Sequence, residues 1–302
     1  LKFMKNLSII GSGRIVEEHI KAALHCNIKV QHIFSSRPGS NNAQRLSKKY
    51  KIENVKAFDK FIELSNKTKS NFLIAGKITK NAFYLKKCIE TKKKILIEKP
   101  VFLKSQNFKK YLKSNSQIFV GFNRIYYKNI KTLKNIIGKS KNITVNCFCP
   151  ELNKTRVVSN SSHIISILLF LFKNIKLIYR HKQKKGIFLR YKLSNDNIVN
   201  LFINYNAIAN FKIELISENF FIELPSIEEL KVYNKLEKIN LNNNNIYKLK
   251  CSYKANEYNF NKIKPGILFQ MKEFKNFCNG KNIINDLRFT EKIIKICEEI
   301  IQ

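Results

Sequence analysis

The sequence predicts an α/β protein in which a doubly wound parallel sheet is followed by an α+β domain with a mostly antiparallel sheet. Strand-like and helix-like segments alternate up to residue 121, which is typical of parallel strands joined by helices. A glycine-rich turn follows the first strand-like segment, as in dinucleotide-binding domains. From about residue 123, several strand-like runs follow one another with short polar turns. We therefore expect two domains, a dinucleotide-binding domain of residues 1–121 and an α+β domain of residues 122–302.

The chain is strongly basic, with a formal net charge of +36 over 302 residues. Its lysines are spread along the whole sequence and accompany no nucleic-acid-binding motif. The frequent Lys, Asn and Ile are the composition that an AT-rich coding sequence produces. We expect nonspecific attraction to polyanions at low salt but no specific nucleic-acid partner. An anionic small substrate, such as a sugar nucleotide, suits the same charge equally well.

Nothing in the sequence predicts a membrane span, a signal peptide or a metal site. No apolar run approaches the roughly 18 residues that a spanning helix needs, and the N-terminal residues lead directly into a strand. The seven cysteines show no metal-ligand spacing. Their odd number without a secretory signal indicates reduced thiols, so we expect a cytoplasmic protein that neither enters nor binds a membrane.

The first strand, residues 6–10, runs into Gly11-Ser12-Gly13-Arg14-Ile15, and a helix follows to about residue 25. In this context Gly11 makes the turn, Gly13 lets a pyrophosphate approach the backbone, and the helix N-terminus stabilises the phosphates. Val16 stands where a third small residue is usual, so we expect the helix to lie slightly further from the strand.

The second strand, residues 28–34, ends in Ser35-Ser36-Arg37, where a domain selective for NAD carries an acid for the ribose hydroxyls. Hydroxyl groups and a guanidinium suit a 2′-phosphate instead. The sequence therefore favours NADP(H), with NAD(H) as the alternative. The simpler interpretation, that Arg37 only opens the loop before a Pro-Gly turn, remains open.

The remaining elements of the first domain alternate in the same way. The pattern predicts further strands at 71–75, 95–97 and 117–121 and helices at 41–50, 82–91 and 105–114. The strand at 95–97 is wholly apolar and ends in Glu98-Lys99-Pro100. Pro100 restricts Lys99 to an extended backbone, so a charged pair is held at the strand end where such sheets bind ligands. The alternative is a surface loop with a solvated lysine.

The second domain contains mostly strands. The pattern predicts strands at 143–148, 176–181, 186–193, 198–204 and 211–216, helices at 129–137, 161–172, 265–278 and 286–301, and a loop tip at 242–245. Both faces of the strand at 198–203 carry apolar residues, more than one buried side requires. Either a second copy of the chain or the terminal helices cover the second face.

Several motifs together resemble the Gfo/Idh/MocA oxidoreductases, and the resemblance spans nearly the whole chain. They are Gly11-Ser12-Gly13-Arg14-Ile15, Ser36-Arg37, Glu98-Lys99-Pro100, Gly121-Phe122-Asn123-Arg124, Asn160-Ser161-Ser162-His163, Lys264-Pro265-Gly266 and Gln270-Met271-Lys272-Glu273-Phe274. The resemblance implies a Rossmann domain followed by a sheet domain that covers the nicotinamide. It also implies a homodimer or homotetramer built on that sheet, and a sugar or sugar-nucleotide substrate, as in short members of surface-polysaccharide biosynthesis.

The resemblance also assigns roles to individual residues. Lys99 would stabilise alkoxide charge and assist proton transfer, beside a Lys99–Pro100 bond that is cis in similar proteins. His163 would be an acid/base or orient the substrate; a capping or core histidine is an equal alternative. The cofactor would contact Gly11, Ser12, Gly13, Arg14, Ile15, Ser36, Arg37, Ala75, Gly76, Glu98 and Lys99. The substrate would contact Arg124, Tyr126, Asn160 and His163, although a surface salt bridge for Arg124 and a core position for Tyr126 are open alternatives.

Three positions depart from the family pattern. Family members often carry acids where this chain has Ser159 and Ser166, and a His where it has Asn81. These departures would favour a catalytically weak or inactive relative with a sensing or structural role. The retained Lys99 and His163 favour an active NAD(P)-dependent dehydrogenase or reductase acting on CH–OH groups, and this is the function that we expect.

Overall fold

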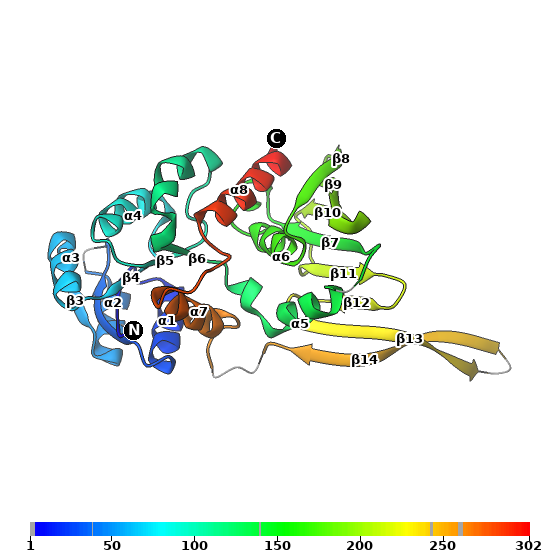
Figure 1. Cartoon of the computed structure of the whole chain (residues 1–302), viewed down its shortest axis with the longest axis horizontal. Helices are drawn as coiled ribbons and strands as arrows, with labels where there is room; N and C mark the ends of the chain where they lie inside the picture. Colours follow the sequence, from blue (N-terminus) through cyan, green and yellow to red (C-terminus); the bar gives the residue numbers. More distant parts are fainter. Residues whose placement is uncertain (1–3, 38, 139, 242–243, 259–261) are drawn as a thin grey trace. The chain divides into compact units, whose positions relative to one another are not determined.

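The structure is a computed structural model, and it describes the whole chain except residues 1–3, 38, 139, 242–243 and 259–261. The chain forms two compact units (Figure 1). The first comprises Leu1–Tyr126 and Asn261–Lys295, and the second comprises Tyr127–Phe260 and Ile296–Gln302. The predicted domain of residues 1–121 lies wholly within the first unit.

The first unit is built on a six-stranded parallel sheet in the order β3-β2-β1-β4-β5-β6. Its strands are β1 (Asn6–Ile10), β2 (Lys29–Phe34), β3 (Glu53–Val55), β4 (Asn71–Ile74), β5 (Ile95–Glu98) and β6 (Ile118–Gly121). The strand order reverses direction between β1 and β4, which is the topological switch point where doubly wound sheets bind ligands. The predicted Rossmann-type sheet is confirmed; β3 was not predicted because it contains only three residues.

Helices connect these strands. They are α1 (Arg14–His25), α2 (Asn41–Tyr50), α3 (Phe58–Lys67), α4 (Asn81–Glu90) and the 3₁₀ segments η1 (Ile78–Lys80), η2 (Ser105–Gln117) and η3 (Asn123–Tyr126). The α-helix predicted at 105–114 is a 3₁₀ helix instead. Its serine and asparagine side chains compete for backbone hydrogen bonds and weaken an α-helix, while Phe108 and Tyr111 still anchor the segment in the core.

The C-terminal helix α7 (Ile267–Cys278) belongs to the first unit, although it follows the second unit's sheet in the sequence. It contacts α1, and the Lys275 ammonium donates to the Cys26 carbonyl at 2.7 Å. The ring of Phe274 packs edge-on against Phe119 of β6, with 5.7 Å between centroids. Helix α8 (Leu287–Ile301) begins in the first unit and ends in the second.

The second unit is built on an eight-stranded sheet in the order β14-β13-β12-β11-β7-β10-β9-β8. The strands are β7 (Thr144–Glu151), β8 (Ile175–Gln183), β9 (Gly186–Leu193), β10 (Ile198–Tyr205), β11 (Lys212–Ile216), β12 (Phe221–Leu224), β13 (Glu229–Leu241) and β14 (Asn244–Asn256). Its helices are α5 (Lys128–Ile137), η4 (Lys154–Arg156), α6 (Ser162–Phe172) and η5 (Ser194–Asp196). Among the described strands of this sheet, the pair β7 and β10 is parallel and the other pairs are antiparallel, so the predicted mostly antiparallel sheet is confirmed.

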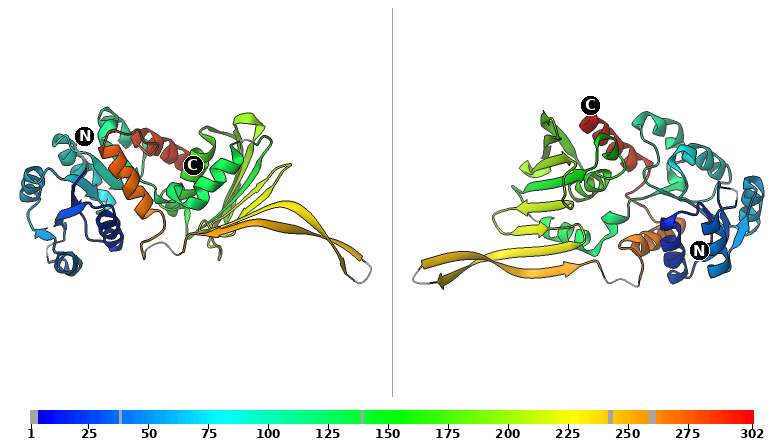
Figure 2. Two further views of the ribbon diagram at one scale, coloured as in Figure 1. Left: turned by 60° about the horizontal axis from the view of Figure 1, so that its bottom comes forward. Right: turned by 180° about the vertical axis from the view of Figure 1, so that it is seen from behind.

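The sequence analysis did not predict the last three strands of this sheet. Strands β13 and β14 form a long hairpin that extends beyond the neighbouring strand β12 (Figure 2). Their distal residues carry many lysines and asparagines instead of alternating apolar and polar residues, so the strand period is hidden. Of the loop predicted at 242–245, residues 242–243 lie outside the described part of the chain, and 244–245 begin β14.

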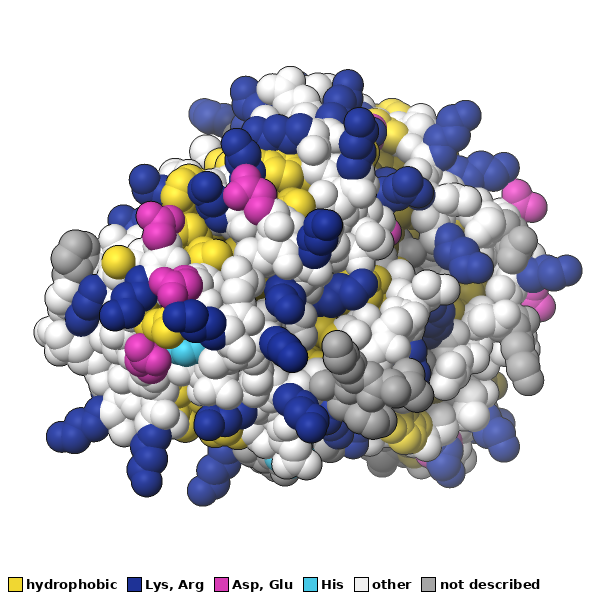
Figure 3. Space-filling model, turned by 60° about the vertical axis from the view of Figure 1, so that its left-hand side comes forward, with side chains coloured by type: hydrophobic (Ala, Val, Ile, Leu, Met, Phe, Trp, Pro, Cys, Tyr) yellow, Lys and Arg dark blue, Asp and Glu magenta, His cyan; other side chains and the backbone are white. Residues whose placement is uncertain are grey.

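On the face drawn in Figure 3, basic side chains are scattered rather than gathered in one patch. Within the described residues, no helix combines the length and apolar character needed to cross a bilayer. The described residues also contain no group of three or more His, Cys, Asp or Glu placed to hold a metal ion.

Candidate functional site

The glycine turn after β1 lies at the switch point of the parallel sheet. Gly11 has a φ of +127°, which L side chains rarely adopt, and a Cβ there would lie 2.3 Å from the Ala75 carbonyl oxygen. The same Cβ would lie 3.1 Å from the Gly76 nitrogen. Only glycine therefore lets the first turn pass against the end of β4, and this contact brings Gly11, Ala75 and Gly76 together.

Helix α1 presents an uncapped N-terminus at this turn. Gly13 is the N-cap and makes no side-chain hydrogen bond, and Arg14 and Ile15 begin the helix. A Cβ on Gly13 would meet nothing within 4 Å, so the space in front of the first helical N–H groups is open. Backbone donors and the positive end of the helix dipole suit a diphosphate at this position.

Polar side chains hold the turn in place. The Ser12 hydroxyl lies 3.1 Å from the hydroxyls of both Ser35 and Ser40. The Asn42 amide donates to the Ser12 carbonyl. The glycine turn, the end of β2 and the beginning of α2 are thus joined by hydrogen bonds that do not depend on a ligand.

A small cavity of about 220 Å³ lies at the end of β2. It is lined by Phe34, Ser35, Ser36, Arg37, Gly39, Ser40, Ala43, Asn54, Val55 and Lys56. Two of these side chains are cations, three are serines, and none of the ten is a carboxylate. Arg37 and Ser36 are exposed, so their polar groups are accessible. Hydroxyl and cationic groups therefore dominate the polar part of this lining, and the preference for a 2′-phosphate stays a prediction.

The carboxyl end of β5 carries a hydrogen-bonded His–Glu pair that the sequence analysis did not anticipate. His19 of α1 is fully buried, and its Nε2 lies 2.6 Å from Glu98 Oε1. Because a carboxylate only accepts hydrogen bonds, Nε2 is the donor, and Nδ1 has no hydrogen-bond partner in the described structure. The contact fixes the Glu98 side chain directly before Lys99.

The backbone after Lys99 is also fixed. The Lys99–Pro100 peptide bond is cis, in agreement with the prediction. The buried Asn81 amide donates to the carbonyl oxygens of Pro100, at 3.3 Å, and Val101, at 3.2 Å. Asn81, which stands where family members carry a histidine, therefore supports the loop that bears Lys99. Lys99 itself is half-buried.

Gln270 of α7 brings an amide to the same edge of the sheet. Its side chain is fully buried, and neither its Nε2 nor its Oε1 has a hydrogen-bond partner among the described residues. A Cβ on Gly121 would lie 3.3 Å from Gln270 Nε2 and 3.0 Å from Glu98 Oε1. An unpaired buried amide is costly, so Gln270 is a candidate contact for a polar cofactor group at the ends of β5 and β6.

The residues predicted to bind the substrate are divided between the units. Arg124 and Tyr126 lie in η3 of the first unit, where Arg124 is half-buried. Tyr126 is buried, its hydroxyl donates to Asn285 Oδ1 at 2.5 Å, and burial together with Glu273 raises its pKa well above the usual value. This placement agrees with the core alternative for Tyr126, and its contact with a substrate stays a prediction.

Asn160 and His163 lie at the beginning of α6 in the second unit. His163 is buried. The hydroxyls of Ser159 and Ser166 donate to the carbonyls of Arg156, at 3.1 Å, and of His163, at 2.7 Å. Both serines that replace family acids therefore serve local backbone structure.

A carboxylate nevertheless reaches the beginning of α6. Glu151, the last residue of β7, is buried and accepts hydrogen bonds from Asn160 Nδ2, at 3.1 Å, and from the Ser161 hydroxyl. The sequence analysis missed Glu151 because the residue belongs to a different element from the acids expected near His163. The alternation along β7 could have indicated it, because Glu151 falls on the buried face of the strand whereas its neighbour Pro150 falls on the other face.

His19 was also detectable. Val16, His19, Ile20 and Ala23 form the buried face of α1, so the helical period places a histidine among apolar residues. Buried histidines require partners. That the partner of His19 is the Glu98 carboxylate is known only from the fold.

The geometry of the first unit fits a dinucleotide cofactor. The glycine turn and the N-terminus of α1 would hold a pyrophosphate, and the cavity after β2 would hold the adenosine ribose and any 2′-phosphate. Glu98, Lys99 and Gln270 would lie at the nicotinamide end. The unpaired Gln270 amide and the space that a side chain at Gly13 would fill are the observations in favour of this fit.

Comparison with known proteins agrees with this geometry. Residues 5–122 match the family model described as "Oxidoreductase family, NAD-binding Rossmann fold", which represents the Gfo/Idh/MocA proteins. No curated protein matches the sequence. The family match confirms the prediction of an NAD-binding oxidoreductase, a dehydrogenase or reductase.

Solved structures share the fold over the whole chain. A dehydrogenase (MviM) from Clostridium difficile is 14% identical with a TM-score of 0.76, and the match covers 100% of this chain and 99% of the other. UDP-N-acetylglucosamine 3-dehydrogenase GnnA from Acidithiobacillus ferrooxidans is 10% identical, with a TM-score of 0.74 and coverage of 98% and 96%. A proposed NADPH-dependent oxidoreductase from Desulfitobacterium hafniense is 11% identical, with a TM-score of 0.80 and coverage of 98% and 94%.

The glycine turn, the Glu98-Lys99-Pro100 strand end and the family match all lie within the same parallel-sheet unit, and the two-unit architecture recurs in these dehydrogenases. Residues 5–122 therefore match the NAD-binding Rossmann domain of the Gfo/Idh/MocA oxidoreductase family, and the fold of the whole chain is that of these dehydrogenases.

Proposed function

We propose that this protein transfers a hydride between a nicotinamide cofactor and a hydroxyl or carbonyl group of a sugar or sugar nucleotide. The observation that carries the proposal is the placement of Lys99 after the His19–Glu98 pair, at the ligand-binding edge of a dinucleotide-type sheet. The similar architecture of UDP-N-acetylglucosamine 3-dehydrogenase supports the substrate class. A role in surface-polysaccharide biosynthesis and a cytoplasmic location stay predictions.

The chain's own residues supply the proton chemistry. The nicotinamide, when bound, accepts or supplies the hydride. In the oxidation of an alcohol, Lys99 Nζ would take up the hydroxyl proton if it is a neutral amine, or would stabilise the alkoxide charge if it is an ammonium, as the hydride leaves carbon. Glu98 directly precedes Lys99 in the chain, and His19 keeps the Glu98 carboxylate in position. His163, from the second unit, would assist as an acid/base or by orienting the substrate.

The direct test is a titration of the protein with NADH and NADPH, followed by a screen of sugars and sugar nucleotides for turnover. The chain contains no tryptophan, so the emission of the bound reduced cofactor is easy to measure. Binding of one cofactor and turnover of a sugar would support the proposal. Cofactor binding without any turnover would support the alternative of a catalytically weak or inactive relative, consistent with Ser159 and Ser166.

We further propose that NADP(H) is the preferred cofactor, with NAD(H) as the alternative. Changing Arg37 to alanine is expected to weaken NADPH binding about 10-fold or more, because one charge-assisted hydrogen bond contributes about 1.5–3 kcal/mol. NADH, which lacks the 2′-phosphate, should be nearly unaffected. Emission titrations with both cofactors measure the difference.

Arg45→Ala is the matched control for this experiment. Arg45 is an exposed arginine of the adjacent helix α2, and its guanidinium pairs with Glu17 at 2.5 Å instead of facing the cavity after β2. The control should leave both affinities unchanged. Equal weakening of NADPH and NADH by Arg37→Ala would contradict the proposed 2′-phosphate contact.

We also propose that a second copy of the chain covers the open face of the eight-stranded sheet. Three rings, Phe188, Phe202 and Phe148, lie side by side across β9, β10 and β7, with centroids 4.9–5.0 Å apart. All three are only half-buried in the single chain. The opposite face of β10 is filled by Val199, Leu201 and Ile203, which are fully buried.

A polar row beside these rings makes the face compatible with self-association. Arg190 donates to Asn200, which donates to Asn146, and both distances are 2.9 Å. Further along the sheet, Lys212 lies 2.8 Å from Glu214 and 3.2 Å from Glu223. Glu214 and Glu223 are thus paired with a lysine of the same face. Two copies of the chain can therefore meet at this face despite the net charge of +36.

Phe202→Lys is expected to reduce the assembly to single chains, because it places a charge among the three rings. Light scattering at micromolar concentrations should show a dimer or tetramer for the native chain and one-chain mass for the variant. Ile208→Lys, at a fully exposed position of the same unit, is the control and should leave the assembly intact. A native chain that scatters only as one chain would contradict the proposal.

A further inference from the structure

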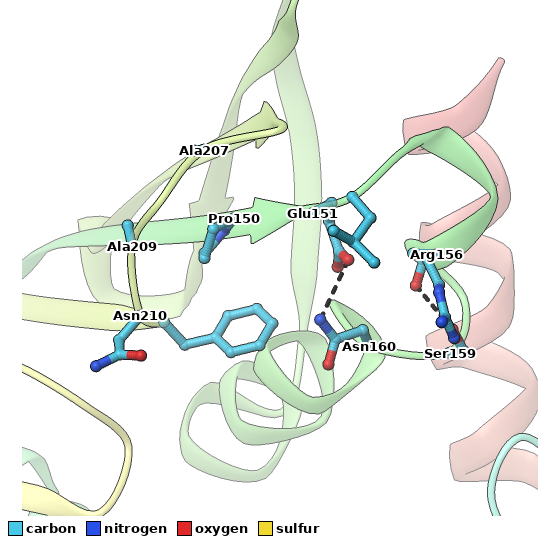
Figure 4. Close-up of a pocket in the computed structure, with 10 residues that line it drawn as sticks. Pro150, Glu151, Arg156, Ser159, Asn160, Ala207, Ala209 and Asn210 are labelled. Carbon is cyan, nitrogen blue, oxygen red and sulfur yellow. Dashed lines mark hydrogen bonds between the residues drawn. The ribbon is translucent and has the colours of Figure 1, made fainter.

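A cavity of the second unit lies at the carboxyl ends of the parallel strand pair β7 and β10. It has a volume of about 530 Å³, within the range of about 300–1,000 Å³ that is usual for small-molecule sites. Its lining comes from the end of β7, the segment before α6 and the loop after β10 (Figure 4). Residues of this cavity other than Asn160 have been given no role so far in binding.

Two opposite charges line this cavity without pairing. Glu151 is buried, and its oxygens accept from Asn160 and Ser161, which fixes the carboxylate in one orientation. Arg156 is exposed, and the described structure contains no ion pair between its guanidinium and a carboxylate. Figure 4 shows Arg156 and Glu151 on neighbouring parts of the rim.

The Glu151 carboxylate and the Arg156 guanidinium bind different chemical groups of a ligand. A carboxylate has about four acceptor sites and no donor, and two of those on Glu151 are used, so it can still accept hydrogen bonds from hydroxyl groups. A guanidinium has only donors, in a planar fork that matches phosphate. One ligand that satisfies both must therefore carry hydroxyl groups and an anionic group on the same molecule.

The rest of the lining suits a carbohydrate ring or a nucleobase. Asn210 and Ser159 add polar groups that both donate and accept hydrogen bonds. Leu152 and Phe211 supply apolar surface, and the aromatic face of Phe211 can pack against the C–H face of a sugar or against a base. The cavity is too large for a phosphate ion alone.

We propose that this cavity binds the phosphorylated part of a phosphosugar or nucleotide-linked sugar, with the phosphate on Arg156 and sugar hydroxyls on Glu151. The proposal rests on the function proposed above and narrows the substrate from sugars in general to phosphorylated sugars. Asn160, which contacts Glu151, links the cavity to the beginning of α6, where His163 lies. The phosphate-bearing end of the substrate would thus be held by the second unit alone.

The test measures binding by calorimetry for three probes, UDP-N-acetylglucosamine, N-acetylglucosamine and inorganic phosphate. The native chain should bind the nucleotide sugar more tightly than either of the other probes. Arg156→Ala should weaken binding of the nucleotide sugar about 10-fold or more and leave that of N-acetylglucosamine unchanged. Glu151→Gln keeps the shape of the side chain but removes its charge, and it should weaken both sugar probes.

Lys154→Ala is the matched control, because Lys154 is an exposed cation two positions before Arg156 that does not line the cavity. It should leave all affinities unchanged. Equal binding of UDP-N-acetylglucosamine by the native chain and Arg156→Ala would overturn the proposal, as would equal losses in Arg156→Ala and Lys154→Ala.

Emission titrations with NADH and NADPH separate this proposal from the proposed function. If the native chain binds a reduced cofactor but none of the phosphorylated probes, the cavity proposal falls while the oxidoreductase proposal stands. If it binds UDP-N-acetylglucosamine through Arg156 but neither cofactor, the cavity proposal stands and the proposed function falls. The native affinity for the cofactors should be retained in Arg156→Ala.

Discussion

Lys99→Met is expected to lower turnover of an identified substrate by about 10²–10⁴-fold, the usual cost of removing a positioned proton donor. Methionine keeps much of the length of the side chain but cannot carry charge or move a proton. Binding of NAD(P)H should be nearly unchanged, because the glycine turn and the cavity after β2 remain intact. Steady-state kinetics and cofactor emission measure the two effects separately. His163→Ala is expected to lower turnover less than Lys99→Met does.

The control for this variant is Lys104→Met. Lys104 is an exposed lysine of the same loop region, immediately before η2. Lys104→Met should retain native turnover. Because it removes the same single positive charge as Lys99→Met, a difference between the two variants reflects the position of Lys99 and not the net charge. Native turnover in Lys99→Met would contradict the assignment of Lys99, and loss of cofactor binding in that variant would show that Lys99 has a binding role instead.

Gly11→Ala and Gly13→Ala are expected to abolish cofactor binding for different reasons. At Gly11, alanine would adopt a φ of +127° and its Cβ would lie 2.3 Å from the Ala75 carbonyl. The backbone strain alone costs about 1–3 kcal/mol, and the clash adds to it. The midpoint of urea unfolding of the first unit should therefore fall together with NAD(P)H binding.

At Gly13 the folded protein should tolerate alanine. The residue has an ordinary φ of −68°, and its Cβ would meet nothing within 4 Å. The free energy of unfolding should change by less than about 1 kcal/mol. Cofactor binding should nevertheless be lost, because the new methyl group would fill the space that a pyrophosphate needs. Native NAD(P)H affinity in Gly13→Ala would contradict this location of the pyrophosphate.

The sequence alone determined the features that depend on local chemistry. Gly11 and Gly13 between a strand and a helix predict the dinucleotide turn, since their spacing reflects a backbone conformation that few residues adopt. Pro100 after a wholly apolar strand places Lys99 at a strand end. Alternating strands and helices predict the parallel sheet, and the motifs carry the resemblance to the Gfo/Idh/MocA proteins.

Only the tertiary structure showed which distant residues meet. His19 pairs with Glu98, and Gln270 reaches the same strand ends from a helix near the C-terminus. Glu151 supplies a carboxylate beside Asn160 that no acid near His163 in the sequence provides. Each of these contacts joins two elements whose local patterns are independent of one another. Local propensity fixes which residues face inward along an element, whereas packing of the whole fold decides what each of them touches.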